Sequence, residues 1–116
     1  MTAAFTASNP WSLLGLCIAL EVTATTLLTK SEGFGRPLYG LASIVLFSGC
    51  FWVLSLVLTR IPVGVTYAIW SGVGIAAISV IGWLFLKQPL SLAQTGFIVL
   101  IVIGAVGLNL TTHTAG

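Results

Sequence analysis

The chain has 116 residues, of which 58% are hydrophobic and only 5% are Asp, Glu, Lys or Arg. A soluble domain carries roughly 25% charged residues, so this composition excludes a surface that is hydrated on all sides and predicts a protein embedded in a bilayer. The four basic residues are scattered singly, which excludes a basic patch for nucleic acid.

Four apolar segments follow one another along the chain, and each approaches the ~20 residues that cross a membrane as a helix. They span residues 11–29, 38–58, 63–86 and 90–110. The junctions SEGFGRP, TRIPVG and KQPLS each contain a proline and at least one basic residue. The sequence therefore predicts an all-α membrane protein, with one transmembrane domain of four helices over residues 1–116.

The first segment carries a carboxylate, Glu21, midway between Trp11 and Lys30. A charged side chain at this depth costs from about 3 to more than about 10 kcal/mol, so the carboxylate must be protonated or paired with a cation. Two interpretations remain open. Glu21 exchanges a proton for another cation, or it stays protonated and joins two helices through a hydrogen bond.

Residues three and four apart share one face of a helix, which identifies the neighbours of Glu21. The residues that we expect to line a cavity beside the carboxylate are Leu14, Cys17, Ile18 and Thr25. Among them, Thr25 has a hydroxyl that can donate a hydrogen bond in this region.

The third segment contains a matching face, in which Tyr67, Trp70, Ser71 and Gly74 recur at steps of three and four. An organic cation without N–H donors is recognised by an anion and by aromatic π-faces. Glu21 together with Tyr67 and Trp70 would supply both, although a single aromatic residue is also typical of packing or of an interfacial anchor. Gly72 and Gly74 predict a kink or hinge in this helix, or simply relieve crowding.

In the fourth segment, Gly96, Leu100 and Gly104 form a narrow stripe that predicts a helix–helix contact. Basic residues are only slightly more numerous in the first and third loops than in the second, which sets orientation poorly. Insertion in both orientations would allow an antiparallel homodimer, with two copies of Glu21 in one midplane cavity.

Cys17 and Cys50 lie in apolar runs and are interpreted as small packing residues rather than a disulfide or a metal pair. His113 has no second ligand near it in the sequence, so no metal site is predicted. No pattern in the chain calls for a cofactor.

Several stretches resemble the small multidrug resistance family, and within it the branch of quaternary ammonium exporters. They are EVTATTLLTKSEGF, the Phe51–Trp52 pair, IPVGVTYAIWSGVGI and the glycine-rich last segment ending in LNL. The resemblance implies a proton-coupled exporter of cations that works as an antiparallel homodimer in the bacterial inner membrane. It also implies that Glu21 binds protons and substrate alternately.

The resemblance assigns roles to further residues. Tyr67 and Trp70 correspond to substrate-binding aromatics, Ser71, Gly72 and Gly74 to the point where the third helix bends, and Leu100 and Gly104 to the dimer contact. Departures from the family pattern include Phe47, which replaces a tyrosine expected at the cavity, and Leu20, which replaces a small residue. Gly96 lies one position before the expected glycine, where Phe97 stands, and Lys30 lies one position after the usual lysine.

Two alternatives to a broad exporter remain open. The same fold can serve a small polar substrate such as guanidinium or a betaine- or choline-like osmolyte, although Ala24 stands where the guanidinium branch of the family has a tryptophan. The chain can also be a non-transporting membrane subunit, or one half of a heterodimer.

Overall fold

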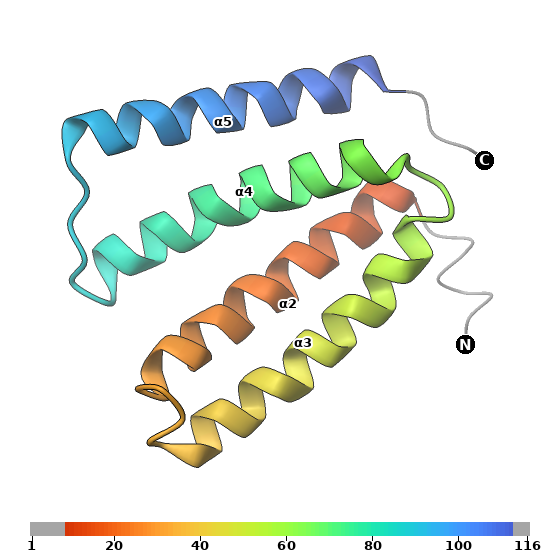
Figure 1. Cartoon of the computed structure of the whole chain (residues 1–116). Helices are drawn as coiled ribbons and strands as arrows, with labels where there is room; N and C mark the ends of the chain where they lie inside the picture. The colour runs from red at the N-terminus through yellow and green to blue at the C-terminus, as the bar shows by residue number, and fades with distance from the viewer. Residues whose placement is uncertain (1–8, 113–116) are drawn as a thin grey trace.

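The computed structural model describes residues 9–112, so His113 lies outside the described part of the chain. The described residues form helices α2 (Pro10–Lys30), α3 (Pro37–Val57), α4 (Val63–Leu84) and α5 (Leu92–Thr111) (Figure 1). All 4 helices are long and apolar enough to cross a membrane, which confirms the prediction of an all-α chain with that number of spans.

Polar side chains and prolines set the ends of the helices. The Asn9 side chain accepts a hydrogen bond of 2.8 Å from the Trp11 backbone N–H, and Pro10 occupies the first helical position, where no N–H is needed. At α5, the Ser91 hydroxyl accepts from the Gln94 backbone N–H (3.1 Å) and the Gln94 side chain accepts from the Ser91 N–H (2.9 Å). This capping box starts α5 at Leu92, slightly later than the predicted residue 90.

The third span is shorter than predicted, because α4 ends at Leu84 rather than at residue 86. Lys87 has a positive φ of 55°, which no α-helix contains, and Pro89 disfavours helical backbone at the residue before it. Residues 85–91 therefore form the connection to α5.

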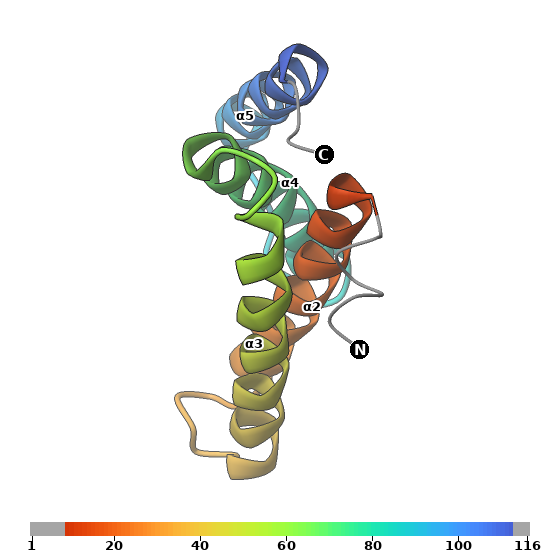
Figure 2. The same cartoon turned by 90° about the vertical axis from the view of Figure 1, so that its right-hand side faces the viewer.

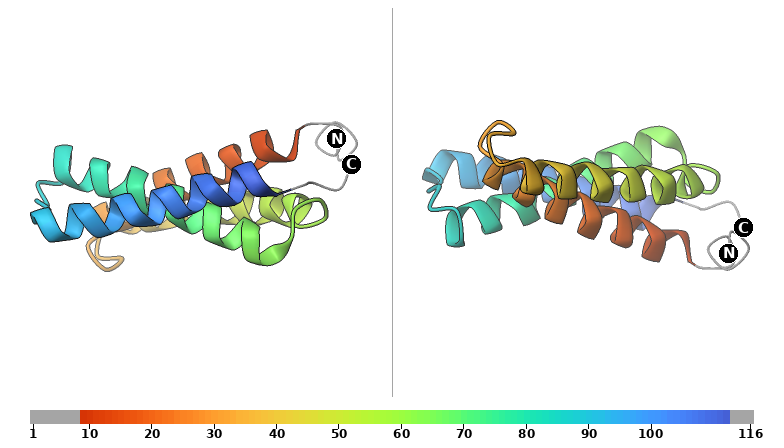
Figure 3. Two further views of the ribbon diagram at one scale, coloured as in Figure 1. Left: turned by 90° about the horizontal axis from the view of Figure 1, so that it is seen from above. Right: turned by 90° about the horizontal axis from the view of Figure 1, so that it is seen from below.

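The helices lie in the order α3, α2, α4, α5 (Figure 1), so that α2 packs against both α3 and α4, while α5 packs on α4. Figure 2 shows α4 between α5 and the pair formed by α2 and α3. The molecule measures 42 × 35 × 18 Å, and the smallest dimension is less than two full helix diameters of about 10–12 Å. Views from above and below show the same thin layer (Figure 3). A single chain is thus an open slab of helices, and broad apolar faces remain uncovered.

The best-buried contact joins α2 to α3. Cys17 and Cys50 are both fully buried there, and each thiol donates to the backbone carbonyl of the other residue, with Sγ–O distances of 3.6 and 3.3 Å. Both cysteines are free thiols, in agreement with their interpretation as packing residues. By contrast, Ala105 is the single buried residue of α5.

Candidate functional site

Glu21 lies in the middle of α2 and turns its carboxylate toward α4. Oε1 accepts a hydrogen bond of 3.0 Å from the Thr25 hydroxyl, one turn further along the same helix. Oε2 is buried and has no hydrogen-bond partner among the described residues. Because a buried oxygen without a partner is costly, this atom is suited to receive a proton or a cation.

Gly74 provides the space for this carboxylate on α4. A Cβ atom added at Gly74 would lie 3.0 Å from Glu21 Oε2 and 3.8 Å from the carboxyl carbon. Only a glycine therefore allows the carboxylate to approach the α4 backbone so closely without displacement.

Two aromatic side chains lie on the same face of α4. The rings of Tyr67 and Trp70 contact each other edge to face, with centroids 5.7 Å apart and planes at 78°. The Tyr67 side chain is 62% exposed in the single chain, whereas the indole N–H of Trp70 is buried without a partner among the described residues.

These residues surround a cavity of about 280 Å³ between α2 and α4. Its lining consists of Glu21, Tyr67, Trp70, Ser71, Gly74, Ile75 and Ile78. The structure thus brings together the carboxylate, both aromatics and Ser71. Ile75 and Ile78 were not singled out from the sequence, although they continue the face of Ser71 by steps of four and three, because apolar residues at such spacing look like ordinary packing.

Other residues expected at the cavity lie elsewhere. Leu14 and Ile18 line a separate cavity of about 230 Å³ that also contacts α4 and α5. Cys17 faces α3 rather than α4. Phe47 stacks on Phe51 of its own helix, with ring centroids 6.1 Å apart. None of these four residues is part of the Glu21 cavity in the single chain.

Gly72 and Gly74 serve two different contacts in the structure. A Cβ at Gly72 would lie 3.2 Å from both the Ala105 Cβ and the Ile101 Cγ2, so α5 packs closely against α4 at Gly72. Helix α4 runs without interruption through both glycines from Val63 to Leu84. The two positions therefore let neighbouring groups come close to α4 from α5 and from α2.

The stripe on α5 is uncovered in the single chain. A Cβ added at Gly96 or at Gly104 would have nothing within 4 Å, and Leu100 is 61% exposed. The side of α5 that carries this stripe is therefore open in the single chain.

The described residues contain no group of three or more potential metal ligands. What they contain is one carboxylate in the membrane interior, facing an aromatic pair across a small cavity. Ionisable residues at this depth mark ion and substrate pathways. Fold and site together define the class: a small four-helix membrane transport protein.

Comparison with known proteins gives the family. The family model described as "Small Multidrug Resistance protein" matches residues 9–101. The chain is 42% identical to the multidrug transporter EmrE of Escherichia coli over 91% of its own length and 96% of that protein. It is 44% identical to the quaternary ammonium compound-resistance protein QacE of Escherichia coli, over 90% and 96% of the two chains. It is 39% identical to the nicotine metabolites export pump subunit NepA of Paenarthrobacter nicotinovorans, over 86% of each chain.

The chain belongs to the small multidrug resistance family. It is consequently a transporter and not an enzyme, and it is a multi-pass protein of the bacterial inner membrane.

Proposed function

We propose that the protein is a proton-coupled antiporter that exports quaternary ammonium and other hydrophobic or aromatic cations by alternating access. The observation that carries this proposal is the buried Oε2 of Glu21, which has no hydrogen-bond partner within residues 9–112, in a cavity bounded by Tyr67 and Trp70. An anion beside π-faces suits a cation that cannot donate hydrogen bonds. The names of EmrE and QacE, a multidrug transporter and a quaternary ammonium resistance protein, support the same substrate class.

Proton coupling follows from competition for one carboxylate. In the membrane interior Glu21 must hold either a proton or a cation, because the bare charge is too costly. Binding of a substrate cation on the cytoplasmic side therefore releases protons, and rebinding of protons on the other side expels the cation. The inward proton gradient then drives cation export, provided that the empty, charged state does not change its orientation.

The working unit in this proposal is an antiparallel homodimer. The slab shape of the chain, the 62% exposure of Tyr67 and the uncovered Gly96–Leu100–Gly104 stripe all leave surface for a second copy. Two inverted copies place a site at the bilayer midplane, which is the arrangement that inverted-repeat transporters use. Phe47, outside the cavity of one chain, is then available to the shared site.

The experiment that tests this function uses the purified full-length chain in liposomes. A substrate such as tetraphenylphosphonium should release protons on binding and be taken up against its gradient when a pH gradient is applied. Glu21→Gln should abolish both activities, whereas Glu32→Gln, in the loop after α2, should preserve them. Transport that persists in Glu21→Gln would contradict the mechanism.

A small polar substrate is the first alternative, and Ser71 in the cavity lining favours it as a hydrogen-bonding group. A panel of tetraphenylphosphonium, choline, betaine and guanidinium in the same liposomes distinguishes the two substrate classes. Dependence on Tyr67 and Trp70 for the aromatic cation, tested with alanine variants, supports the broad exporter. Exclusive transport of choline or betaine supports the alternative.

A heterodimeric or non-transporting subunit is the second alternative, and the designation of NepA as a pump subunit favours it. Robust transport by the purified chain alone contradicts this alternative. A folded chain that transports none of the four compounds supports it.

A further inference from the structure

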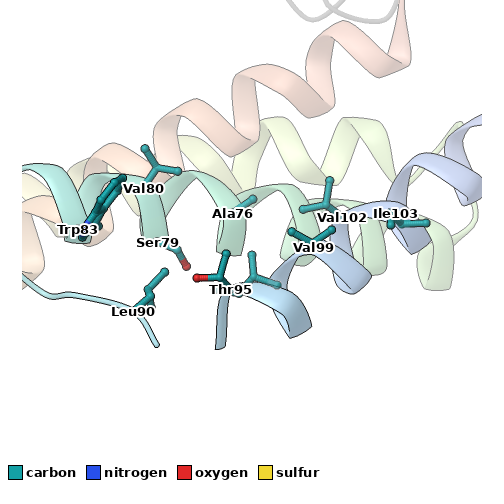
Figure 4. Close-up of a pocket in the computed structure, with 10 residues that line it drawn as sticks. Ala76, Ser79, Val80, Trp83, Leu90, Thr95, Val99, Val102 and Ile103 are labelled. Atoms are coloured by element: carbon teal, nitrogen blue, oxygen red, sulfur yellow. The ribbon is translucent and has the colours of Figure 1, made fainter. Parts of the chain in front are cut away.

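A cavity larger than the one at Glu21 lies on the side of α4 that faces away from Glu21. It measures about 490 Å³, well above the 280 Å³ of the Glu21 cavity, and lies within the range of ~300–1,000 Å³ that is typical of ligand pockets. Helix α4 contributes Ala76, Val80 and Trp83, and α5 contributes Thr95, Val99 and Ile103 (Figure 4). We call this cavity the α4–α5 groove.

The groove is apolar along nearly its whole length. Besides the indole N–H of Trp83, its side-chain polar groups are the hydroxyls of Ser79 and Thr95, and Figure 4 shows these two pointing toward each other near the loop end. The Thr95 hydroxyl already donates to the Ser91 backbone carbonyl at 3.0 Å. A ligand with many hydrogen-bonding groups would therefore find few partners, whereas a hydrocarbon chain fits this lining.

The groove also has the direction and the length of one membrane leaflet. It begins at Leu90 and Trp83, beside the loop of residues 85–91, and extends along α5 to Ile103. From Thr95 to Ile103 the helix rises about 12 Å, which is most of the ~15 Å of hydrocarbon in one leaflet. Trp83, 58% exposed at the loop end, is the residue type that settles at headgroup depth.

Charge at the mouth of the groove indicates the headgroup. Lys87 is the only charged residue of the loop 85–91, and its side chain is exposed. Basic residues at the end of a pocket between transmembrane helices attract anionic lipid headgroups. We propose that the α4–α5 groove binds one acyl chain of an anionic phospholipid, whose phosphate lies near Lys87.

A second copy of the chain is a less suitable occupant. Val99 and Ile103 lie three or four residues from members of the Gly96–Leu100–Gly104 stripe, so this rim of the groove borders the stripe. Thr95, Ile98 and Val102 lie on the other flank, toward Ala105 and the edge that faces α4. A partner seated on the stripe would therefore border the rim at Val99 and Ile103, and the part of the groove lined by Thr95, Ile98 and Val102 would stay open to lipid. The lipid proposal does not depend on transport and is tested by binding alone.

The test uses the full-length chain in vesicles of phosphatidylcholine that contain phosphatidylglycerol with a photoactivatable diazirine on one acyl chain. After illumination, peptide mapping should find the label concentrated in residues 76–83 and 95–103. Excess unlabelled phosphatidylglycerol should compete with the probe and lower the labelling of these peptides more than phosphatidylcholine with the same acyl chains does. A label spread evenly over the exposed residues of α3 would overturn the proposal.

Two variants place a phenylalanine side chain in the α4–α5 groove, one from α4 and one from α5. Ala76→Phe on α4 and Val99→Phe on α5 should each lower groove labelling at least tenfold, whereas Val45→Phe, at a 69% exposed position of α3, should leave it unchanged. Two filling variants keep the test decisive if one of them fails to fold. Lys87→Gln should retain acyl-chain labelling but reduce the preference for phosphatidylglycerol by about fivefold.

Other outcomes name other occupants and contradict the proposal. Unchanged labelling in both filling variants means that the lipid acyl chain does not lie in the α4–α5 groove. A cross-link between the grooves of two copies, formed by Val80→Cys, means that a second protomer fills the groove. An unchanged lipid preference in Lys87→Gln overturns the assignment of the headgroup.

Discussion

Gly74 of α4 faces the carboxylate of Glu21 on α2, and a Cβ at position 74 would lie 3.0 Å from Glu21 Oε2. The glycine is thus a direct neighbour of the atom that the proposed mechanism loads with a proton or a cation. The position of the Glu21 carboxylate therefore depends on the size of the residue at position 74.

Gly74→Ala should move the Glu21 carboxylate while leaving the fold intact, because a flexible side chain can shift where backbone cannot. We expect cation affinity to fall by about 1–3 kcal/mol, the usual cost of overpacking. Isothermal titration with tetraphenylphosphonium measures it. Gly64→Ala, where a Cβ meets nothing within 4 Å, is the matched control. Equal affinity in the two variants would contradict the assigned contact.

Thr25→Val removes the hydroxyl that donates to Glu21 Oε1 at 3.0 Å and preserves the shape of the side chain. Hydrogen bonds to charged groups contribute about 1.5–3 kcal/mol, so the carboxylate should bind a cation less tightly by an amount in this range. Thr26→Val is the control, since its hydroxyl donates to the Val22 backbone carbonyl instead (2.8 Å). The same titration tests both, and a loss of equal size in Thr26→Val would show that the effect is not specific to Glu21.

Gly72→Leu should separate α5 from α4, because the added side chain meets Ala105 and Ile101 of α5. Overpacking of this kind costs about 1–3 kcal/mol in the free energy of unfolding. Unfolding in mixed detergent micelles, followed by circular dichroism, measures the change. Gly64→Leu places the same side chain on α4 in open space and should be nearly neutral. If both variants unfold alike, the contact with α5 does not limit stability.

Gly104→Leu should disrupt the proposed dimer without unfolding the single chain, since nothing lies within 4 Å of a Cβ at this position. Cross-linking yield should fall at least tenfold for Gly104→Leu and less for Gly104→Ala, with helical content unchanged. Ile103→Leu, beside the stripe, should keep the wild-type yield. A dimer that tolerates leucine at position 104 would exclude this stripe from the interface.

The fold was largely predictable because charge and proline are so scarce in this chain. Lys30 closes α2, while Pro37 opens α3, so the spans follow from where polar residues interrupt the apolar ones. Only at the ends next to Lys87 do the predicted and observed spans differ by more than one residue, because its positive φ and the capping box at Ser91 depend on loop geometry that periodicity does not describe.

The site was predictable only in part, because helical periodicity gives a face but not the neighbour of that face. The face of α2 that carries Glu21 is wide enough to contact two helices. Cys17 meets α3 while Glu21 meets α4, although both belong to it. Similarly, the sequence predicts a kink or relief of crowding at Gly72 and Gly74, but it does not say that one glycine lies against α5 and the other against Glu21.

The cavity around Glu21 is built from α2 and α4 alone, while the exposed glycine stripe belongs to α5. The proposed cargo site and the proposed dimer contact therefore lie on different helices of the same short chain. Selection can alter α5 to favour self-pairing or pairing with a sister subunit without redesigning the binding chemistry. Under the proposed function, duplicated copies of such a gene could diverge in how they pair while keeping the same binding chemistry.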